Sequence, residues 1–260
     1  MTAAFVYISA VIWYAFSRRG RIALITANFG GIDGLKVLPS HEGIDAFYYT
    51  DAGTVAAASP EAMKTWTRVL VPNYPRDDFS PRLRARYFKH QIHRLDEVRD
   101  HRWLVWADSS LQFHDLEFVV KQIQVLARLP AHQRVLLVPH PDRKTIQEEF
   151  RFIQGGIEGG DPYLVQRYAH EKMPEQMEYF QSRGWNLDSK LWCGTFWVME
   201  NSERLRRAWD AWWDQNLRFG MMDQLSLPVI LEDHGIEPRA LDVNLSRNEH
   251  FTWETHLKSM

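Results

Sequence analysis

Polar residues stand directly after four apolar runs of the sequence. The clearest case is Asp108, which follows the run WLVWA at residues 103–107. Continuous apolar runs of this length are typical of buried strands, and in open α/β sheets ligands bind beyond the carboxyl ends of the strands. The other polar residues in such positions are Asn28, Asp51 and His140. These four residues are the first candidates for a ligand site.

The residues around Asp108 have the chemistry to bind a nucleoside diphosphate. Asp108 and Ser110 offer oxygen ligands of the kind that Mg²⁺ and Mn²⁺ prefer, and Arg86 and Lys89 offer positive charge. A divalent cation or such basic side chains can stabilise a departing diphosphate. Asp108-Ser109-Ser110 resembles the Asp-x-Asp that follows a buried strand in metal-dependent glycosyltransferases, with a neutral hydroxyl in the third position. The alternative for Asp108 is a local role, as a helix cap or in an Asx-turn.

Strands and helices that would position these residues recur with α/β spacing. The predicted strands are 22–27, 46–50, 66–71, 103–107, 134–138 and 191–200. The predicted helices are 81–93, 115–129, 145–154, 162–183, 202–217 and 222–233. The segment GGIEGG at 155–160 predicts a flexible loop, which is a candidate lid or hinge. We therefore expect one α/β domain with a mixed central sheet flanked by helices.

Composition excludes several classes of protein. Hydrophobic residues make up 45% and charged residues 25% of the 260 residues, which is the balance of a globular chain and not of a disordered one. The net charge of -2 offers no general attraction for nucleic acid, so we expect no nucleic-acid partner. The single cysteine, Cys193, excludes an intrachain disulfide and a multi-cysteine zinc site and fits a reducing compartment. We expect Cys193 to be buried in the core and not to act as a nucleophile.

The first 21 residues form a segment distinct from the domain predicted at 22–260. Residues 3–16 are almost wholly apolar, and the basic run SRRGR follows at 17–21. A helix over the 14 apolar residues would span about 21 Å, which is short of a hydrocarbon core of about 30 Å. The remaining interpretations are an interfacial helix, a helix packed on the domain, and the remnant of a longer upstream sequence. Weak membrane association would place the domain in the cytoplasm, because basic residues favour that side.

Six short motifs resemble, in order, those of a family of glycosyltransferase-like proteins of bacteria and plants, which includes plant proteins linked to mucilage and turgor. They are ITANFGGID at 25–33, YTD at 49–51, RYFK at 86–89, VWADSS at 105–110, HPDR at 140–143 with Glu148 and Glu149, and MDQLS at 222–226. Together they extend over residues 22 to about 231. Met222 departs from the family pattern, which has a basic residue in that position.

The resemblance implies a single GT-A-like (Rossmann-like) domain that transfers a sugar from a nucleoside-diphosphate sugar to the hydroxyl group of a saccharide or another acceptor. A divalent cation, Mn²⁺ or Mg²⁺, is the expected cofactor. The donor-binding residues would be Thr26, Asn28, Phe29, Asp51, Arg86, Lys89, Asp108 and Ser110. The acceptor-binding residues would be His140, Arg143, Trp192 and Gln224. The metal ligands would be Asp108, Ser110 and His250.

Two residues of this set have alternatives that the sequence leaves open. Asp223 and Asp108 are the candidate catalytic residues. Asp223 is the leading candidate for the base, because a carboxylate near the acceptor can activate its hydroxyl group. Asp108 would act beside the diphosphate. The alternative for Asp223 is a helix cap. His140 would position the acceptor or contact phosphate, and its alternative is a structural role before Pro141.

Two other classes of function compete with the transferase. An oxidoreductase or methyltransferase would also begin with a strand and a glycine turn, but GGIDG at 30–34 does not fit G-x-G-x-x-G. The sequence does not exclude the second alternative, a non-catalytic domain that binds carbohydrate or a nucleotide sugar. The eleven tryptophans fit a transferase and a sugar-binding domain equally, because sugar rings stack on aromatic faces. The alternative for most of these tryptophans is packing in the core.

Overall fold

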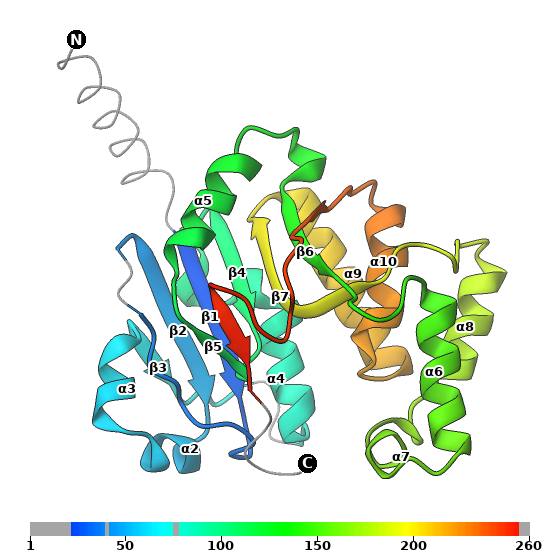
Figure 1. Cartoon of the computed structure of the whole chain (residues 1–260), viewed down its shortest axis with the longest axis horizontal. Helices are drawn as coiled ribbons and strands as arrows, with labels where there is room; N and C mark the ends of the chain where they lie inside the picture. Colours follow the sequence, from blue (N-terminus) through cyan, green and yellow to red (C-terminus); the bar gives the residue numbers. More distant parts are fainter. Residues whose placement is uncertain (1–21, 40–41, 75–77, 255–260) are drawn as a thin grey trace.

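A mixed sheet organises the chain, which we describe from a computed structural model. The structure describes residues 22–39, 42–74 and 78–254 (Figure 1). Within these residues, seven strands form the sheet in the order β3-β2-β1-β4-β7-β6-β8. They are β1 (Ile22–Asn28), β2 (Ile44–Thr50), β3 (Arg68–Leu70), β4 (Trp103–Ala107), β6 (Val135–Pro139), β7 (Trp192–Glu200) and β8 (Arg239–Ala240). β7 runs antiparallel to both of its neighbours, β4 and β6, whereas the other pairs are parallel.

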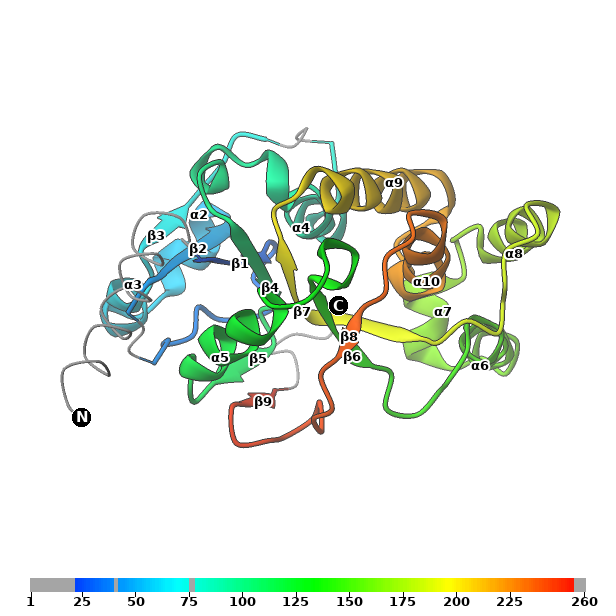
Figure 2. The same ribbon diagram turned by 90° about the horizontal axis from the view of Figure 1, so that it is seen from above.

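Helices cover both faces of the sheet, as Figure 2 shows from above. One face packs on α5 (Glu117–Leu126), and the other packs on α4 (Pro81–His90), α9 (Glu203–Phe219) and α10 (Asp223–Asp233). Alternate residues of β4 point to opposite faces: Val105 packs in the cluster that contains Phe118 of α5, and Leu104 packs in the cluster that contains Trp209 of α9. The predicted α/β architecture, a mixed central sheet flanked by helices, is confirmed.

A third apolar cluster lies beside the sheet and joins three further helices to α10. These helices are α6 (Ile146–Glu158), α7 (Pro162–Tyr168) and α8 (Met173–Ser182). Ile153 of α6, Leu164 of α7 and Phe180 of α8 are buried in this cluster with Val229 of α10. The cluster forms one wall of the cavity described below.

Two predictions about this region are wrong. Residues 155–158 of the expected glycine-rich loop belong to α6. A Cβ atom on Gly156 would collide with Leu164 Cδ1, so this glycine permits close packing of α6 on α7 and is not a hinge. The single helix predicted at 162–183 is two helices, α7 and α8. The second helix begins at Met173, with Pro174 in its first turn, where a proline is tolerated because the N–H group it lacks has no partner within the helix.

The C-terminal residues return to the sheet on the α5 side. β5 (Leu111–Phe113) and β9 (Phe251–Trp253) form a two-stranded antiparallel sheet. Leu241, Leu245 and Phe251 are buried with α5. The remaining short elements are α2 (Ala52–Ala57), α3 (Pro60–Thr65) and the 3-10 helices Ile92–Arg94, Asp96–Val98 and Ala131–Gln133.

The apolar N-terminal segment at 1–21 lies outside the described residues. Among the residues that the structure does describe, none of the helices is long and apolar enough to span a bilayer.

Candidate functional site

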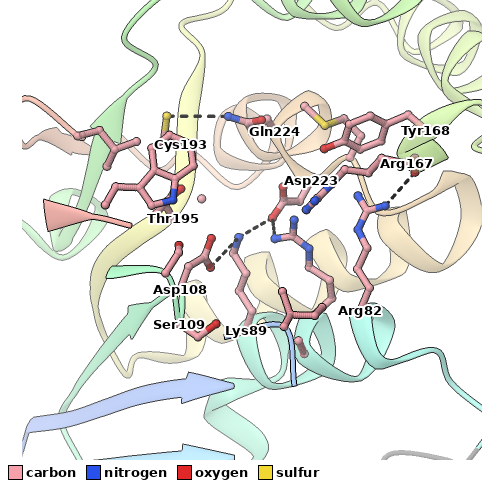
Figure 3. Close-up of a pocket in the computed structure, with 18 of the residues that line it drawn as sticks. Arg82, Lys89, Asp108, Ser109, Arg167, Tyr168, Cys193, Thr195, Asp223 and Gln224 are labelled. Atoms are coloured by element: carbon pink, nitrogen blue, oxygen red, sulfur yellow. Dashed lines mark hydrogen bonds and ion pairs between the residues drawn. The ribbon is translucent and has the colours of Figure 1, made fainter. Parts of the chain in front are cut away.

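A cavity of about 340 Å³ opens at the carboxyl ends of β1 and β4. Its walls come from segments far apart in the sequence: the loop after β1, the helix α4, the turn after β4, the start of β7 and the start of α10. Figure 3 shows the labelled side chains converging on this space. We call it the central cavity. Its position agrees with the general rule for open α/β sheets.

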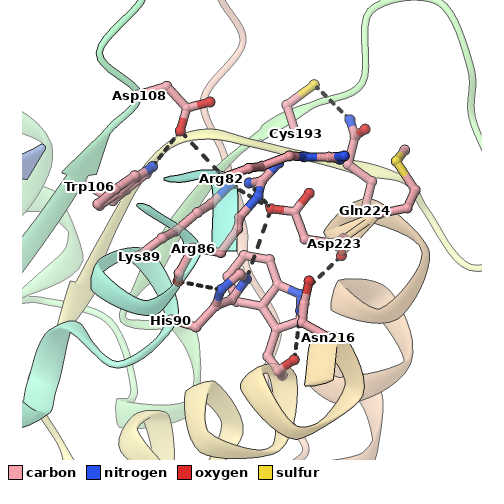
Figure 4. Close-up of polar contacts among 12 residues, drawn as sticks. Arg82, Arg86, Lys89, His90, Trp106, Asp108, Cys193, Asn216, Asp223 and Gln224 are labelled. Carbon is pink, nitrogen blue, oxygen red and sulfur yellow. Dashed lines mark hydrogen bonds and ion pairs between the residues drawn. The ribbon is translucent and has the colours of Figure 1, made fainter. Parts of the chain in front are cut away.

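An ion cluster lies at the base of the central cavity (Figure 4). Asp223, the first residue of α10, is only 3% exposed, and its Oδ2 accepts hydrogen bonds from Arg86 Nη1 at 2.5 Å and Lys89 Nζ at 2.6 Å. Arg86 and Lys89 stand three residues apart on α4, so both side chains project from one face of the helix. The backbone carbonyl of Asp223 accepts a hydrogen bond from the buried Trp212 Nε1 at 3.0 Å. The N-cap of α10 is Met222 and Asp223 makes no capping hydrogen bond, so the capping alternative is wrong.

The electrostatics of this cluster keep Asp223 ionised. Burial raises the pKa of the Asp223 carboxyl, but the charges of Arg86 and Lys89 outweigh this effect and hold its pKa well below the ordinary range. Burial and the neighbouring Arg86 lower the pKa of Lys89. Asp223 is consequently a weak base that holds two cations in place.

Gly194 in β7 allows the ion cluster to lie against the sheet. A Cβ atom at this position would lie 2.5 Å from Lys89 Nζ and 3.1 Å from Asp223 Oδ2. Any larger residue would push the lysine away from its carboxylate. The sequence carries a signal for this role, because an isolated glycine within a strand pattern often marks a close approach.

Asp108 faces the same cavity from the turn after β4. Its Oδ1 accepts a hydrogen bond from Trp106 Nε1 at 2.7 Å and lies 4.0 Å from Lys89 Nζ. Its backbone N–H donates to the carbonyl of Thr195 at 2.8 Å, which fixes the turn to β7. The Asp108 side chain is 33% exposed, so it is accessible to a ligand. The turn leads into β5 and not into a helix, so the helix-cap alternative is wrong.

The loop after β1 is fastened to the turn after β4. Asn28 Nδ2 donates to the backbone carbonyl of Asp33 at 2.5 Å, and Ser109 Oγ donates to Asp33 Oδ2 at 2.5 Å. Phe29 stacks on Phe88 of α4 with ring centroids 5.5 Å apart. These contacts shape one end of the cavity with an amide, a hydroxyl and an aromatic ring.

The protein ligands available for a cation are few. Within the described residues, no group of three or more His, Cys, Asp or Glu side chains is arranged to hold a metal. Asp108 is the carboxylate at the predicted position, and the neighbouring Ser110 is buried. This donor set fits a hydrated cation held mainly through a ligand's phosphate oxygens, as Mg²⁺ often is, and does not fit a site made of protein ligands alone.

A second polar group lines the cavity wall near the start of α6. His140 Nδ1 accepts hydrogen bonds from the backbone N–H groups of Asp142 and Arg143 at 3.2 and 3.1 Å. Burial and the charge of Arg143 lower the pKa of His140 to about 4, so its imidazole is neutral at physiological pH. Arg143 is paired with the buried Glu149. These contacts fit the structural alternative for His140, but its side chain also lines the cavity, so its role towards a ligand stays a prediction.

Exposed aromatic side chains form the rim of the central cavity. Phe152 of α6, Tyr163 of α7 and Trp253 of β9 are 52%, 56% and 49% exposed, and all three line the cavity. Exposed aromatic faces beside polar groups suit the stacking of sugar rings. We call these three side chains the aromatic rim.

Most of the predicted site residues meet in this cavity. Those that line it are Asn28, Phe29, Arg86, Lys89, Asp108, Ser110, His140, Arg143, Asp223 and Gln224. Thr26, Asp51, Trp192 and His250 are not among the lining residues.

Local hydrogen bonds explain why Thr26 and Asp51 are not in the cavity. Thr26 Oγ1 donates to the carbonyl of Ala107 at 3.0 Å within the sheet. Asp51 is the N-cap of α2 and accepts hydrogen bonds from the backbone of Thr54 at 2.8 Å and of Gly30 at 2.6 Å. Burial raises the pKa of Asp51, but these hydrogen bonds outweigh it and lower the pKa. Thr26 thus links β1 to the end of β4, and Asp51 fixes the loop after β1.

Packing explains the positions of Trp192 and His250. Trp192 is buried, with Lys190 Nζ 4.5 Å from the centroid of its ring. His250 stacks on Phe118 with centroids 4.4 Å apart, and its Nδ1 lies 3.5 Å from Asp115 Oδ2. These placements support neither an acceptor role for Trp192 nor a metal role for His250. Cys193 is buried, as predicted, and burial raises the pKa of its thiol to about 12.

Several residues that line the cavity were not among those predicted from the sequence. They are Arg82, Gly194, Thr195, Arg167, Tyr168 and the aromatic rim. Arg82 stands four residues before Arg86 on the basic helix, and this helical spacing was a usable signal. Nothing in the local sequence identifies Arg167 or Tyr168, which reach the cavity through the packing of α7 on α6.

The chain is similar to known proteins in its fold and not in its sequence. No family model matches the sequence, and no curated protein matches it. Among solved structures, the crystal structure of mouse xyloside xylosyltransferase 1 in its apo form is similar with a TM-score of 0.45 and 10% identity, over 85% of this chain and 85% of that one. This similarity is too distant for an activity to be transferred.

Proposed function

We propose that the chain is a glycosyltransferase that uses a nucleoside-diphosphate sugar. The observation that carries this proposal is the convergence of an accessible carboxylate, Asp108, with the partly buried Arg86 and the buried Lys89 at the strand ends of an α/β sheet. The resemblance of six sequence motifs to a glycosyltransferase-like family, with the GT-A-like fold it implies, supports the same activity.

Within this proposal the diphosphate lies against Arg86 and Lys89. Both residues line the central cavity. Charge-assisted hydrogen bonds to phosphate oxygens would stabilise the negative charge that develops on the leaving group. Mn²⁺ or Mg²⁺ would neutralise further charge there, held by Asp108 and the phosphates. The amide of Asn28 and the ring of Phe29 would contact the nucleoside at the adjacent end of the cavity.

Asp223 is our candidate for the base that activates the acceptor hydroxyl, provided that the bound donor raises the pKa of its carboxyl group. Its pKa is low because Arg86 and Lys89 neutralise it. A diphosphate that takes over hydrogen bonds from these cations would raise the pKa of Asp223 and so increase its basicity. Without a donor, Asp223 only positions the two cations.

The acceptor would lie between the aromatic rim and the side chain of Gln224. A saccharide fits this combination, because its ring stacks on aromatic faces and its hydroxyl groups pair with amides. We also propose a cytoplasmic location, from the single cysteine and the basic run at 17–21.

A non-catalytic domain that binds a nucleotide sugar or carbohydrate is the second candidate. The observation that favours it is the low basicity of Asp223, together with the single accessible carboxylate at the diphosphate position. Turnover distinguishes the two functions, because a binding domain would neither transfer nor hydrolyse the donor sugar.

Thermal stabilisation of the purified protein by nucleoside diphosphates and nucleotide sugars, with and without Mn²⁺, tests the donor site. A ligand at about 100 times its Kd should stabilise the fold by about 2.7 kcal/mol. Asp108→Asn should abolish the Mn²⁺-dependent part of this effect. The control is Asp188→Asn, an exposed carboxylate outside the cavity, which should behave as wild type.

Three results decide between the two functions. Metal-dependent stabilisation that is lost in Asp108→Asn, followed by sugar transfer to an added acceptor or donor hydrolysis, supports the transferase. Stabilisation without any turnover favours the binding domain. If saccharides stabilise the protein but no nucleotide does, the donor site is refuted.

A further inference from the structure

Glu149 is a buried carboxylate in the wall of the central cavity, and the proposed function gives it no role. It lies in the first turn of α6, and its side chain is only 3% exposed. The helix turns Glu149 inwards because Ile146 and Ile153, which lie on the same face, are buried in the third apolar cluster. Glu149 Oε2 accepts a hydrogen bond from Arg143 Nε, and both residues line the cavity.

This ion pair leaves one acceptor atom and one donor group unused. Glu149 Oε1 and Arg143 Nη1 make no hydrogen bond among the residues that the structure describes. Neither atom belongs to the fully buried polar atoms that lack a partner, so both remain accessible. Since an ionised carboxylate only accepts hydrogen bonds and a guanidinium only donates them, the pair offers the cavity one group of each kind.

The protein compensates the charge of Glu149 only in part. Burial raises the pKa of the Glu149 carboxyl above its ordinary value, and the hydrogen bond and charge of Arg143 do not fully offset this effect. The charges of Asp142 and Asp223 act in the same direction as burial. A further hydrogen bond donated by a ligand to Glu149 would stabilise its ionised form.

The surroundings of the ion pair favour a hydroxyl group as the ligand. The guanidinium carbon of Arg143 lies 4.1 Å from the centroid of the Phe152 ring, so the pair adjoins the aromatic rim on which a sugar ring can stack. A hydroxyl group both donates and accepts hydrogen bonds, so it can pair with either residue. Glu149 would repel an anionic group at this position, and Arg143 would repel a cationic one.

We propose that Glu149 Oε1 and Arg143 Nη1 bind hydroxyl groups of the acceptor saccharide, with the carboxylate accepting and the guanidinium donating. This inference rests on the proposed function, in which the acceptor lies at the aromatic rim, and it adds Glu149 to the acceptor site. Asp223 keeps its place as the candidate base. Glu149 determines specificity, because it selects acceptors that carry a hydroxyl group in the matching position.

Calorimetric titration of the full chain with the methyl glycosides of glucose, galactose, mannose and xylose, with and without nucleoside diphosphate, tests the proposal. Glu149→Gln and Arg143→Lys should each weaken the tightest-binding glycoside by about tenfold, because a charge-assisted hydrogen bond is lost. The matched control is Glu148→Gln, at the neighbouring exposed carboxylate that does not line the cavity. It should bind the glycoside as wild type does.

The monodeoxy derivatives of that glycoside separate a direct contact from a structural role. One derivative should bind wild type about tenfold more weakly than the parent glycoside does. Glu149→Gln should bind this derivative and the parent equally, because the partner of the missing hydroxyl group has been removed. A variant that only distorts the cavity would bind every derivative more weakly and keep the wild-type discrimination among them, and this result overturns the proposal.

Binding of no glycoside at all, or unchanged affinity in a folded Glu149→Gln protein, also overturns it. If Glu149→Gln fails to fold, Arg143→Lys carries the same comparison, since it keeps a positive charge beside Glu149 and loses the guanidinium donors. Failure of every nucleoside diphosphate to bind refutes the donor site alone, since the glycosides are also titrated without nucleotide.

Discussion

A single carboxylate oxygen, Asp223 Oδ2, accepts hydrogen bonds from the partly buried Arg86 and the buried Lys89 at the base of the central cavity. Removing one member of a buried ion pair leaves an uncompensated charge, which costs more than the pair contributes. Arg86 and Lys89 would repel each other without Asp223, and Lys89 is almost completely buried, so it has no access to solvent. The arrangement keeps two cations near one point where an anionic ligand can bind.

We predict that Asp223→Asn lowers the free energy of unfolding by about 3–5 kcal/mol near neutral pH. The pKa of Asp223 is lowered in the folded protein, so the stabilisation is present above the carboxyl's ordinary value of about 3.9 and is lost as the pH falls below it. Urea unfolding of wild type and variant at a series of pH values measures this difference. It should be largest near neutral pH and shrink in acid.

The control for this prediction is Asp233→Asn, at the exposed far end of the same helix. It should change stability by less than about 0.5 kcal/mol. Equal losses for Asp223→Asn and Asp233→Asn would contradict the role assigned to the ion cluster.

Sequence reasoning found the site residues that immediately follow strands or lie on the basic helix. Asn28 and Asp108 could be predicted because parallel strands end at the same edge of a sheet. Asp51 also follows a strand, yet its carboxylate caps α2 instead of facing the cavity. A strand-end position does not determine whether a short carboxylate turns towards a ligand or towards its own helix, since the local hydrogen bonds available to it decide.

At the scale of elements, the direction of β7 explains what the strand-end rule missed. β7 is antiparallel to β4, so its first residues and not its last ones lie beside the turn after β4. Gly194 and Thr195 reach the cavity for this reason. The run LWCGTFWVME predicts a strand but carries no information about its direction, which depends on pairing with distant strands.

The packing of α6 on α7 gives an element-scale prediction from two adjacent glycines. Gly156→Ala places a methyl group against Leu164, so we expect a loss of about 1–3 kcal/mol in the free energy of unfolding. No heavy atom lies within 4 Å of a Cβ atom built at Gly155, in the same helix. Gly155→Ala should therefore stabilise the protein by about 0.5–1 kcal/mol. Chemical denaturation measures the free energy of unfolding of both variants. A loss of stability in both variants would indicate that the backbone freedom of the two glycines matters, as in a hinge, and not the contact of Gly156 with Leu164.

At the scale of the whole molecule, the central cavity is lined by residues from both halves of the chain and by Trp253 of β9. The α/β class and most element bounds could be predicted from periodicity, because burial on the two faces of a sheet leaves a clear pattern. β9 could not, since it is short and its strand partner β5 lies about 140 residues earlier in the chain. Phe251 and Trp253 of β9 nevertheless lie at the apolar core and at the cavity rim.

The different burial of two side chains of β9 gives a prediction that separates folding from binding. Phe251 is fully buried against Phe113, Phe118 and Phe196, so Phe251→Ala should lower the free energy of unfolding by about 3–5 kcal/mol.

Trp253 is half exposed on the aromatic rim, so Trp253→Ala should cost little stability and should weaken saccharide binding by about tenfold. Denaturant unfolding and calorimetry with an oligosaccharide measure the two effects. If Trp253→Ala binds saccharide as wild type does, the rim is not the acceptor surface. If Phe251→Ala leaves stability unchanged, the C-terminal strand is not part of the fold's cooperative core. Because the two side chains are two residues apart on one strand, the opposite outcomes would follow from burial and not from sequence position.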